Sequence, residues 1–411
     1  MRRLLPGKKV SGRPETAPQP RTTSNHDMVG GASFKDKNDP NLLAVAQSSA
    51  SVLPSSSDMG ADNRVTGASK TAGDPEDDRV EVPDKMGTGS RPSSGNLHDP
   101  MPQMEQHSKK KLADIRRLCE GDLSERVYLG KGEFCIAERT HLGNCMVAIK
   151  RLRPDREGDE AAQRDLGREI QLMASMDHPH VLSVIGVGWL DNKLPFMCLE
   201  LLSTVLSREL PKSVEEVPFW TRQRSVKKWP LQRAIHIGVG IAKALNYCHN
   251  EFSDRYRILH RDLKPANIGF MPDNRVVVFD FGVCSFWDKN ESTEQSIDAP
   301  RPLTGLTGSM RYMAPEVALE QPYNYKAEAF SFASVLWEMA SHTRPFEWMD
   351  SSLFIEYACK QGVRCKMGKA WPDELKQLIT SCWSTDIDER PDFLDIVPRL
   401  ERIESTLTTK K

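Results

Sequence analysis

Two short motifs with charged residues, which we expect to meet in space, constrain the fold of this chain more than any other feature. The first is His260–Asn267, which reads His-Arg-Asp-Leu-Lys-Pro-Ala-Asn. The second is Phe279–Gly282, Phe-Asp-Phe-Gly, which puts a carboxylate at the end of a strand-like segment. Residues 271–274, Met-Pro-Asp-Asn, have the composition of a tight turn. We therefore expect a hairpin between the two runs that brings Asn267 and Asp280 to the same end.

The residue types in these runs suit phosphoryl transfer. Asp262 could accept or orient the proton of an attacking hydroxyl, and Lys264 would place a positive charge beside the moving phosphate. Asn267 and Asp280 offer the oxygen ligands that magnesium prefers. Two such motifs in this order resemble the eukaryotic protein kinases. The resemblance covers about residues 124–405. It implies a kinase domain that uses ATP and Mg²⁺ on protein substrates.

A glycine-containing loop upstream resembles the phosphate-binding loop of that family. Glycines let backbone amides approach phosphate oxygens without a Cβ in the way. The family usually has a third glycine where this chain has Cys135, which narrows the space above the phosphates but leaves the first two glycines intact. The resemblance assigns nucleotide binding to the loop and its flanks, namely Leu129, Gly130, Lys131, Gly132, Glu133, Phe134, Cys135, Ile136 and Ala137.

Lys150 ends the run Val-Ala-Ile-Lys, and by resemblance it would pair with the α- and β-phosphates of ATP. Its expected counter-charge is Glu169, on a predicted helix with a neighbouring apolar face. Other acids lie nearby, but only Glu169 directly precedes the apolar Ile170 in the Arg-Glu-Ile context.

The last strand-like run of the small lobe, Pro195–Leu202, is expected to lead into the adenine-binding segment. By resemblance Leu199 would be the gatekeeper residue. Glu200 and Leu202 would contact the nucleotide, Leu202 through its backbone.

Residues 307–316 match the end of the family's activation segment. Glu316 would form a buried ion pair with Arg390. Ser309 would contact Asp262 and Lys264. Glu328 departs from the family pattern, which usually has aspartate at this helix start, and the extra methylene bears on the geometry of the catalytic loop.

Lys264 followed by Pro265 resembles the serine/threonine type of catalytic loop, and Cys382-Trp383 is similar to the tyrosine-kinase-like group. We therefore expect a protein serine/threonine kinase. A dual-specificity kinase and a pseudokinase-like scaffold remain alternatives. A P-loop NTPase is disfavoured, because no G-x-x-x-x-G-K-[ST] run occurs.

Residues 1–110 differ in composition from the rest of the chain. They are rich in Ser, Pro and Gly, contain no Trp, Tyr, Ile or Cys, and have Phe34 as their only aromatic residue. Such a segment cannot bury enough apolar surface to offset its ordering entropy, so we expect it to be disordered. It offers phosphorylation or docking sites, although a plain linker tail is the simpler interpretation.

The bulk composition excludes several classes of protein. The formal net charge is -1, which favours neither nucleic acid nor a membrane surface as a partner. The nine cysteines form no C-x-x-C pair, so we expect a reducing compartment, cytoplasmic or alternatively nuclear. No apolar run reaches the roughly 18 residues that a membrane span needs.

Periodicity favours an α+β protein with a small β-rich lobe followed by a larger, mainly helical lobe. The apolar stretch Ala327–Ser341 predicts a central helix, because it is hydrophobic nearly all round. Residues 211–229 form an insertion with Trp220 and Trp229 near its ends, either a partner-docking element or a solvated helix and loop. A lead-in helix is expected near 112–115, strands at 126–129, 136–139, 146–152, 267–270 and 275–279, and helices at 159–175, 231–249, 326–341 and 373–383.

Two regulatory hypotheses follow from the same residues. Phosphorylation of Thr304, or less readily Thr307, would engage Arg261 and switch the enzyme on. Positive neighbours would lower the pKa of the Cys135 thiol and make the phosphate loop redox-sensitive, although an inert cysteine is the simpler interpretation.

Overall fold

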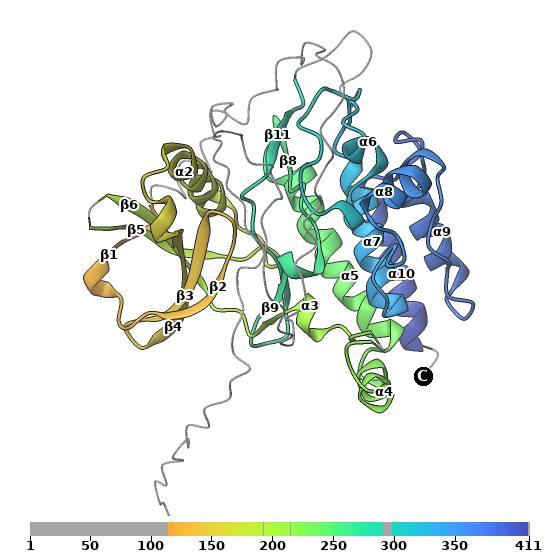
Figure 1. Ribbon diagram of the computed structural model, residues 1–411, viewed down its shortest axis with the longest axis horizontal. Helices are drawn as coiled ribbons and strands as arrows, with labels where there is room; N and C mark the ends of the chain where they lie inside the picture. Colours follow the sequence, from red (N-terminus) through yellow and green to blue (C-terminus); the bar gives the residue numbers. More distant parts are fainter. Residues whose placement is uncertain (1–113, 192, 214, 291–297, 410–411) are drawn as a thin grey trace, which may run out of the picture. The chain divides into compact units, whose positions relative to one another are not determined.

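The computed structural model describes residues 114–191, 193–213, 215–290 and 298–409. The expected disordered region 1–110 lies outside these residues. The described part contains a β-sheet lobe followed by a mainly helical lobe, so the predicted two-lobed α+β fold is confirmed (Figure 1).

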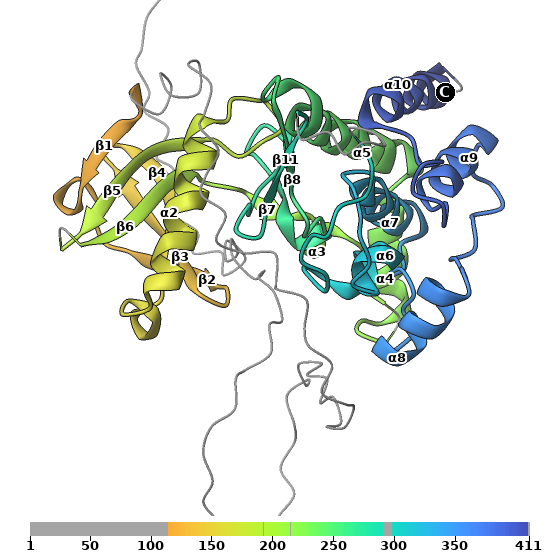
Figure 2. The ribbon, with the colours of Figure 1, turned by 90° about the horizontal axis from the view of Figure 1, so that it is seen from above.

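The first lobe is a six-stranded sheet with strand order β1-β5-β6-β4-β3-β2. Helix α2 (Glu160–Ser175) packs on the sheet (Figure 2). Asp159 caps this helix by accepting bonds from two backbone N–H groups at its start. The strands are β1 (Arg116–Cys119), β2 (Val127–Lys131), β3 (Cys135–Leu142), β4 (Cys145–Leu152), β5 (Val184–Leu190) and β6 (Leu194–Glu200).

The expected lead-in helix near 112–115 lies mostly outside the described residues, and Asp114, the first described residue, is helical. Strand β1 follows, beginning at Arg116 and pairing in parallel with β5. Leu118 is its one inward-facing residue, at 3% exposure.

Two small sheets form part of the second lobe. The predicted hairpin forms from β9 (Ile268–Phe270) and β10 (Val276–Val278), and β7 (Thr204–Val205) extends it to three strands. A separate ladder pairs β8 (Tyr256–Leu259) with β11 (Ser285–Asp288).

The core of the second lobe surrounds α7 (Ala327–Ser341). Nearly every residue of α7 is buried, as its apolar sequence predicts, and α5 packs against both α7 and α10. A left-handed residue, His342, ends α7. The other α-helices of the described residues are α3 (Leu206–Glu209), α4 (Phe219–Lys227), α5 (Leu231–Asn246), α6 (Pro315–Ala318), α8 (Ser351–Leu353), α9 (Asp373–Cys382) and α10 (Phe393–Thr409).

Shorter helical turns join these elements. Helix α5 continues into a π-helical turn rather than ending as an α-helix near residue 249. The short turns are 3₁₀ at Glu120–Asp122, Pro154–Arg156, Pro265–Asn267 and Met310–Tyr312, and π-helical at Tyr247–Glu251 and Phe354–Lys360. None of the described helices combines the length and apolar character that crossing a membrane requires.

Candidate active site

Asp262 has one carboxylate oxygen held and one left open. Its Oδ2 accepts from Lys264 Nζ at 2.8 Å and from Asn267 Nδ2 at 3.1 Å. Its Oδ1 is buried and has no hydrogen-bond partner among the described residues. A buried acceptor without a donor is costly, so this oxygen is prepared to receive one from a bound molecule.

Asn267 shows the same division of its side chain. Its Nδ2 donates to the backbone oxygen of Asp262 at 2.8 Å, which fixes the orientation of the amide. Its Oδ1 is buried and unpartnered within the described part of the chain. An open, fixed oxygen of this kind fits a hard cation such as Mg²⁺.

The predicted ion pair between Lys150 and Glu169 forms. Lys150 Nζ donates to both carboxylate oxygens of Glu169, at 2.7 and 2.8 Å. It also donates to Asp280 Oδ1 at 2.8 Å, which joins the sheet lobe to the Phe-Asp-Phe-Gly run. Burial alone would lower the pKa of Lys150, but the charges of Asp280 and Glu169 outweigh it and raise the pKa above its ordinary value.

Two residues of the site have left-handed backbone conformations that non-glycine residues rarely adopt. Asp280 has φ 67° and Arg261 has φ 64°. Arg261 is held by its N–H, which donates to Glu328 Oε1 at 2.6 Å, and by its Nε, which donates to the oxygen of Val283 at 2.7 Å. Such outliers persist where surrounding bonds over-determine them, and they concentrate at functional sites.

Glu328 reaches the catalytic loop despite its extra methylene. It is 3% exposed, and its second oxygen lies 2.7 Å from His249 Nε2. Burial raises the pKa of Glu328, but the hydrogen bond and charge of His249 outweigh burial and leave that pKa below its ordinary value. Sequence reasoning missed His249. His249 lies in the turn Tyr247–Glu251, beside Asn250 and Glu251, and nothing in that turn indicates a buried acidic partner.

The glycine-containing loop is tied to the strand that carries Lys150. Gly132 N–H donates to the oxygen of Cys135 at 2.7 Å, which closes the turn between β2 and β3. Arg153 donates to the oxygen of Glu133 at 2.9 Å, and its own N–H bonds the oxygen of Phe134 at 2.9 Å. The loop therefore has a defined place beside β4.

Four apolar residues from the predicted nucleotide site belong to the hydrophobic core that extends through both lobes. Leu129 and Ala137 come from β2 and β3, and Leu199 and Leu202 come from the end of β6 and the segment after it. All four are at most 5% exposed. Glu200 lies between the two leucines, and its carboxylate is 3.9 Å from Arg275.

The end of the activation segment is fixed on both sides. Arg390 donates to both oxygens of Glu316, at 2.6 and 2.9 Å, and this predicted buried ion pair is confirmed. Lys264 Nζ donates to Ser309 Oγ at 2.9 Å, so the expected contact of Ser309 with Lys264 forms, whereas no hydrogen bond joins Ser309 to Asp262 among the described residues. Gly308 has φ 98°, and a Cβ there would lie 2.3 Å from the oxygen of Arg261, so only glycine fits.

The premise of a reactive Cys135 is wrong. Lys150 does act on this thiol, but burial dominates and raises the pKa of Cys135 to about 12. Glu169 and Asp280 add to the rise, because they neutralise the lysine and repel a thiolate.

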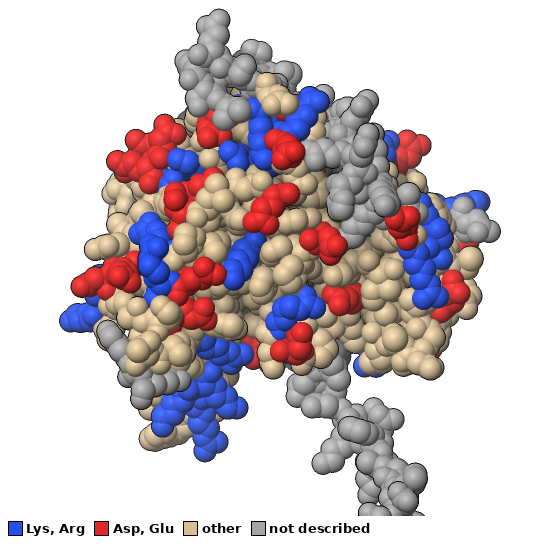
Figure 3. Space-filling model, turned by 180° about the vertical axis from the view of Figure 1, so that it is seen from behind, with Lys and Arg blue, Asp and Glu red and all other residues tan. Residues whose placement is uncertain are grey.

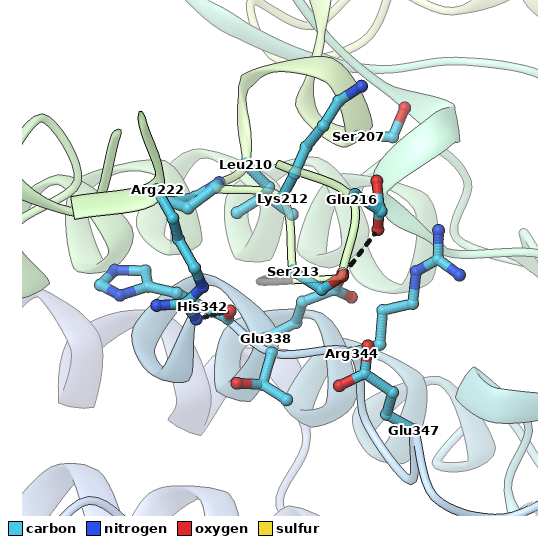
Figure 4. A pocket seen from close by; sticks show the side chains of 12 residues that line it. Ser207, Leu210, Lys212, Ser213, Glu216, Arg222, Glu338, His342, Arg344 and Glu347 are labelled. Atoms are coloured by element: carbon cyan, nitrogen blue, oxygen red, sulfur yellow. Dashed lines mark hydrogen bonds between the residues drawn. The ribbon is translucent and has the colours of Figure 1, made fainter. Parts of the chain in front are cut away.

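A pocket of about 250 Å³ lies apart from these residues (Figure 4). It is bounded by the segment 207–216, by Arg222 of α4, and by the end of α7 with the loop after it. None of the predicted nucleotide- or metal-binding residues lines it. Its most buried acid is Glu338, which accepts a bond of 2.7 Å from the Tyr312 hydroxyl of the activation segment.

Comparisons with known proteins agree with this geometry. A family model described as protein tyrosine and serine/threonine kinase matches residues 116–400. Serine/threonine-protein kinase VIK of Arabidopsis thaliana is 30% identical over 333 residues, which cover 80% of this chain and 70% of VIK. Serine/threonine-protein kinase STY17 of the same plant is 30% identical over 295 residues, 72% of this chain and 45% of STY17.

A third relative carries a different specificity in its name. Dual specificity protein kinase shkE of Dictyostelium discoideum is 28% identical over 245 residues, 59% of this chain and 31% of shkE. The chain therefore spans less than half the length of STY17 and of shkE. The family model covers the lysine, the catalytic loop, the metal-ligand candidates and the activation segment together, and the chain belongs to the protein tyrosine and serine/threonine kinase family.

Proposed function

We propose that this chain transfers the γ-phosphate of ATP to serine or threonine hydroxyls of protein substrates. Protein kinases generally use ATP and Mg²⁺ and act on proteins. The observation that carries the proposal is the divided carboxylate of Asp262, with Oδ2 held by Lys264 and Asn267 and Oδ1 open.

Each residue has a distinct task in this proposal. Asp262 Oδ1 accepts the hydroxyl proton of the substrate, while Lys264 holds the other oxygen and offers its charge to the transferred phosphate. Lys150, fixed by Glu169, positions the α- and β-phosphates. Asn267 and Asp280 would hold Mg²⁺, which supplies charge neutralisation on the phosphates when bound.

The nucleotide would lie between the glycine-containing loop and the segment that follows β6. Leu129, Ala137 and Leu202 offer apolar contacts to adenine, and the backbone at Glu200 and Leu202 offers hydrogen bonds. The serine/threonine names of VIK and STY17 support that specificity, as does Lys264 followed by Pro265.

Two carboxylate variants test the proposal. Asp262→Ala should lower turnover by about 10²–10⁴-fold while ATP binding stays near the wild-type value, because this side chain acts on the hydroxyl. Asp280→Ala should lose turnover and also the Mg²⁺ dependence of nucleotide binding, measured by a fluorescent nucleotide. Asp373→Ala is a matched control, since that carboxylate is 86% exposed on α9. Turnover within tenfold of wild type in either site variant would contradict the assignment.

A dual-specificity kinase is the second candidate, favoured by the name of shkE. Peptides that differ only in carrying Ser, Thr or Tyr distinguish the two. We expect phosphate on Ser and Thr peptides. Equal phosphorylation of the Tyr peptide would establish dual specificity, and no phosphorylation of any peptide by wild type would establish a scaffold.

A further inference from the structure

Helix α4 gives the insertion a strongly basic character. The stretch Phe219–Trp229 contains Arg222, Arg224, Lys227 and Lys228 and no acidic residue. Lys and Arg side chains gather at the lower left of Figure 3, which is the position of α4 in Figure 1 after a half-turn. These basic residues are separate from the candidate active site, because none of them contacts a proposed catalytic or nucleotide-binding side chain.

The helix is held in place at both ends. Arg222 Nη2 donates to the oxygen of His342 at 3.0 Å, and His342 Nε2 donates to the oxygen of Trp229 at 2.8 Å. Trp229 is 2% exposed, and the Arg233 guanidinium lies over its ring at 4.2 Å. The two tryptophans of the insertion therefore have different roles. Trp229 is buried and anchors the insertion, whereas Trp220 is exposed.

The outward face of α4 combines aromatic and cationic side chains. Trp220, Arg224, Lys227 and Lys228 are spaced i, i+4, i+7 and i+8, which places them in one stripe. All four are exposed, and Trp220 reaches 76% exposure beside Phe219 at 54%. The three cations of the stripe form no ion pair with a described residue. Exposure of two aromatic rings to water is unfavourable, and solvation of the helix does not require them, so they indicate an interaction surface.

We propose that this stripe docks on an anionic lipid surface. Tryptophan rings favour the headgroup level of a bilayer, and each Lys or Arg near an anionic leaflet adds electrostatic attraction. A lipid surface fits better than an acidic protein motif, because an exposed tryptophan ring lies in the same stripe as the three cations. The pocket beside α4 is lined by Arg222 and by no member of the stripe.

Vesicle binding by the full chain tests the electrostatic part. Vesicles of phosphatidylserine and phosphatidylcholine should co-sediment with the protein, and phosphatidylcholine alone should not. Arg224→Glu/Lys227→Glu/Lys228→Glu should weaken binding by about 100-fold or more, at roughly fivefold for each lost charge. Added salt should weaken wild-type binding, since these charges are exposed. The variant Arg224→Gln/Lys227→Gln/Lys228→Gln repeats the test without charge reversal.

The aromatic part has its own readout and a matched control. Brominated lipid in the vesicles should quench part of the tryptophan fluorescence of wild type. Trp220→Phe should remove that part, whereas Trp348→Phe should not, although Trp348 is 64% exposed elsewhere in the lobe. Equal quenching in both variants would overturn the assignment of Trp220.

Two further outcomes decide the source of any binding. The basic residues Arg2, Arg3, Lys8 and Lys9 could also attract vesicles. If changing these four to Glu abolishes binding while the stripe variant binds like wild type, the proposal is overturned. Binding of an acidic peptide to the stripe without vesicle binding would overturn it as well. Kinase turnover on a soluble peptide should be equal in wild type and stripe variants, which shows that they fold.

Discussion

The thiol of Cys135 lies among charged groups of the site, and burial governs its chemistry. Its pKa rises to about 12, so almost no thiolate is present near neutral pH. We predict that iodoacetamide labels Cys135 much more slowly than the exposed Cys119 and Cys145 of the same chain. Peptide mass spectrometry after a timed pulse gives all three rates in one experiment.

A protonated, buried Cys135 should also leave the response of activity to oxidation unchanged. Wild type and Cys135→Gly should lose equal activity in mild peroxide, because any sensitive thiol is elsewhere. Labelling of Cys135 as fast as Cys145, or protection of activity by Cys135→Gly, would show that the thiol is reactive after all.

Residues were predictable from sequence where a motif fixes both their type and their order. Lys150, Glu169 and Asp280 are brought together as expected. The partner of Glu328 was not predictable, because His249 lies 79 positions away and only the fold brings the two side chains into contact. The reversed pKa shift of Cys135 has the same origin, since neighbouring charge is visible in sequence but burial is not.

Thr304 and Thr307 of the activation segment differ in how accessible they are to a kinase. Thr307 is 9% exposed, and its hydroxyl donates to the backbone oxygens of Thr304 and Gly305, so a kinase has poor access to it. Thr304 is only partly buried. Its backbone oxygen accepts from Tyr323 at 3.0 Å, and Arg261 interacts with that tyrosine. A phosphate on Thr304 would therefore lie close to the Arg261 cation.

We predict that mass spectrometry of active protein finds phosphate on Thr304 and not on Thr307. Thr304→Ala should lower turnover by about tenfold to a hundredfold, the equivalent of one charge-assisted hydrogen bond. An active preparation with no phosphate in this segment, together with full turnover of the Thr304→Ala/Thr307→Ala double variant, would reject the switch.

Elements were predictable where local periodicity and tertiary pairing agree. The apolar residues of helix α7 and of the β9–β10 hairpin indicate which positions are buried. Strand β1 does not, because its pairing partner β5 lies about 70 residues later and only Leu118 of its four residues is buried. The ladder of β8 with β11 was missed for a related reason, since Ser285–Asp288 is too short to show alternation.

At the scale of the whole molecule, hydrogen bonds connect the sheet lobe to the helical lobe at several places. Lys150 reaches Asp280 at one of them. At a second, Leu182 N–H donates to the oxygen of Val278 at 3.0 Å, and Val278 N–H donates to the oxygen of His180 at 2.8 Å. The two bonds at Val278 involve only the backbone, so side-chain variants at Lys150 or Asp280 should leave this second connection intact.

Stability of the folded molecule should depend on pH through Glu338. This side chain is 7% exposed, and burial raises its pKa to about 7 from the ordinary value of 4.5. Between these two values the folded state holds a proton that the unfolded state has lost. The stabilisation is therefore complete below about pH 4.5 and is lost as the pH rises through about 7, an effect of roughly 3 kcal/mol.

Glu338→Gln should remove this dependence, because an amide still accepts the Tyr312 hydroxyl but does not titrate. We predict that wild type loses free energy of unfolding relative to Glu338→Gln as the pH rises from about 5 to about 8. Urea denaturation of both proteins across this range measures the difference. Glu216→Gln is the matched control, an exposed acid that lines the same pocket, and it should keep the wild-type slope. Parallel pH profiles for wild type and Glu338→Gln would show that Glu338 is ionised throughout and that the buried carboxylate is stabilised by Tyr312 and Arg344 instead.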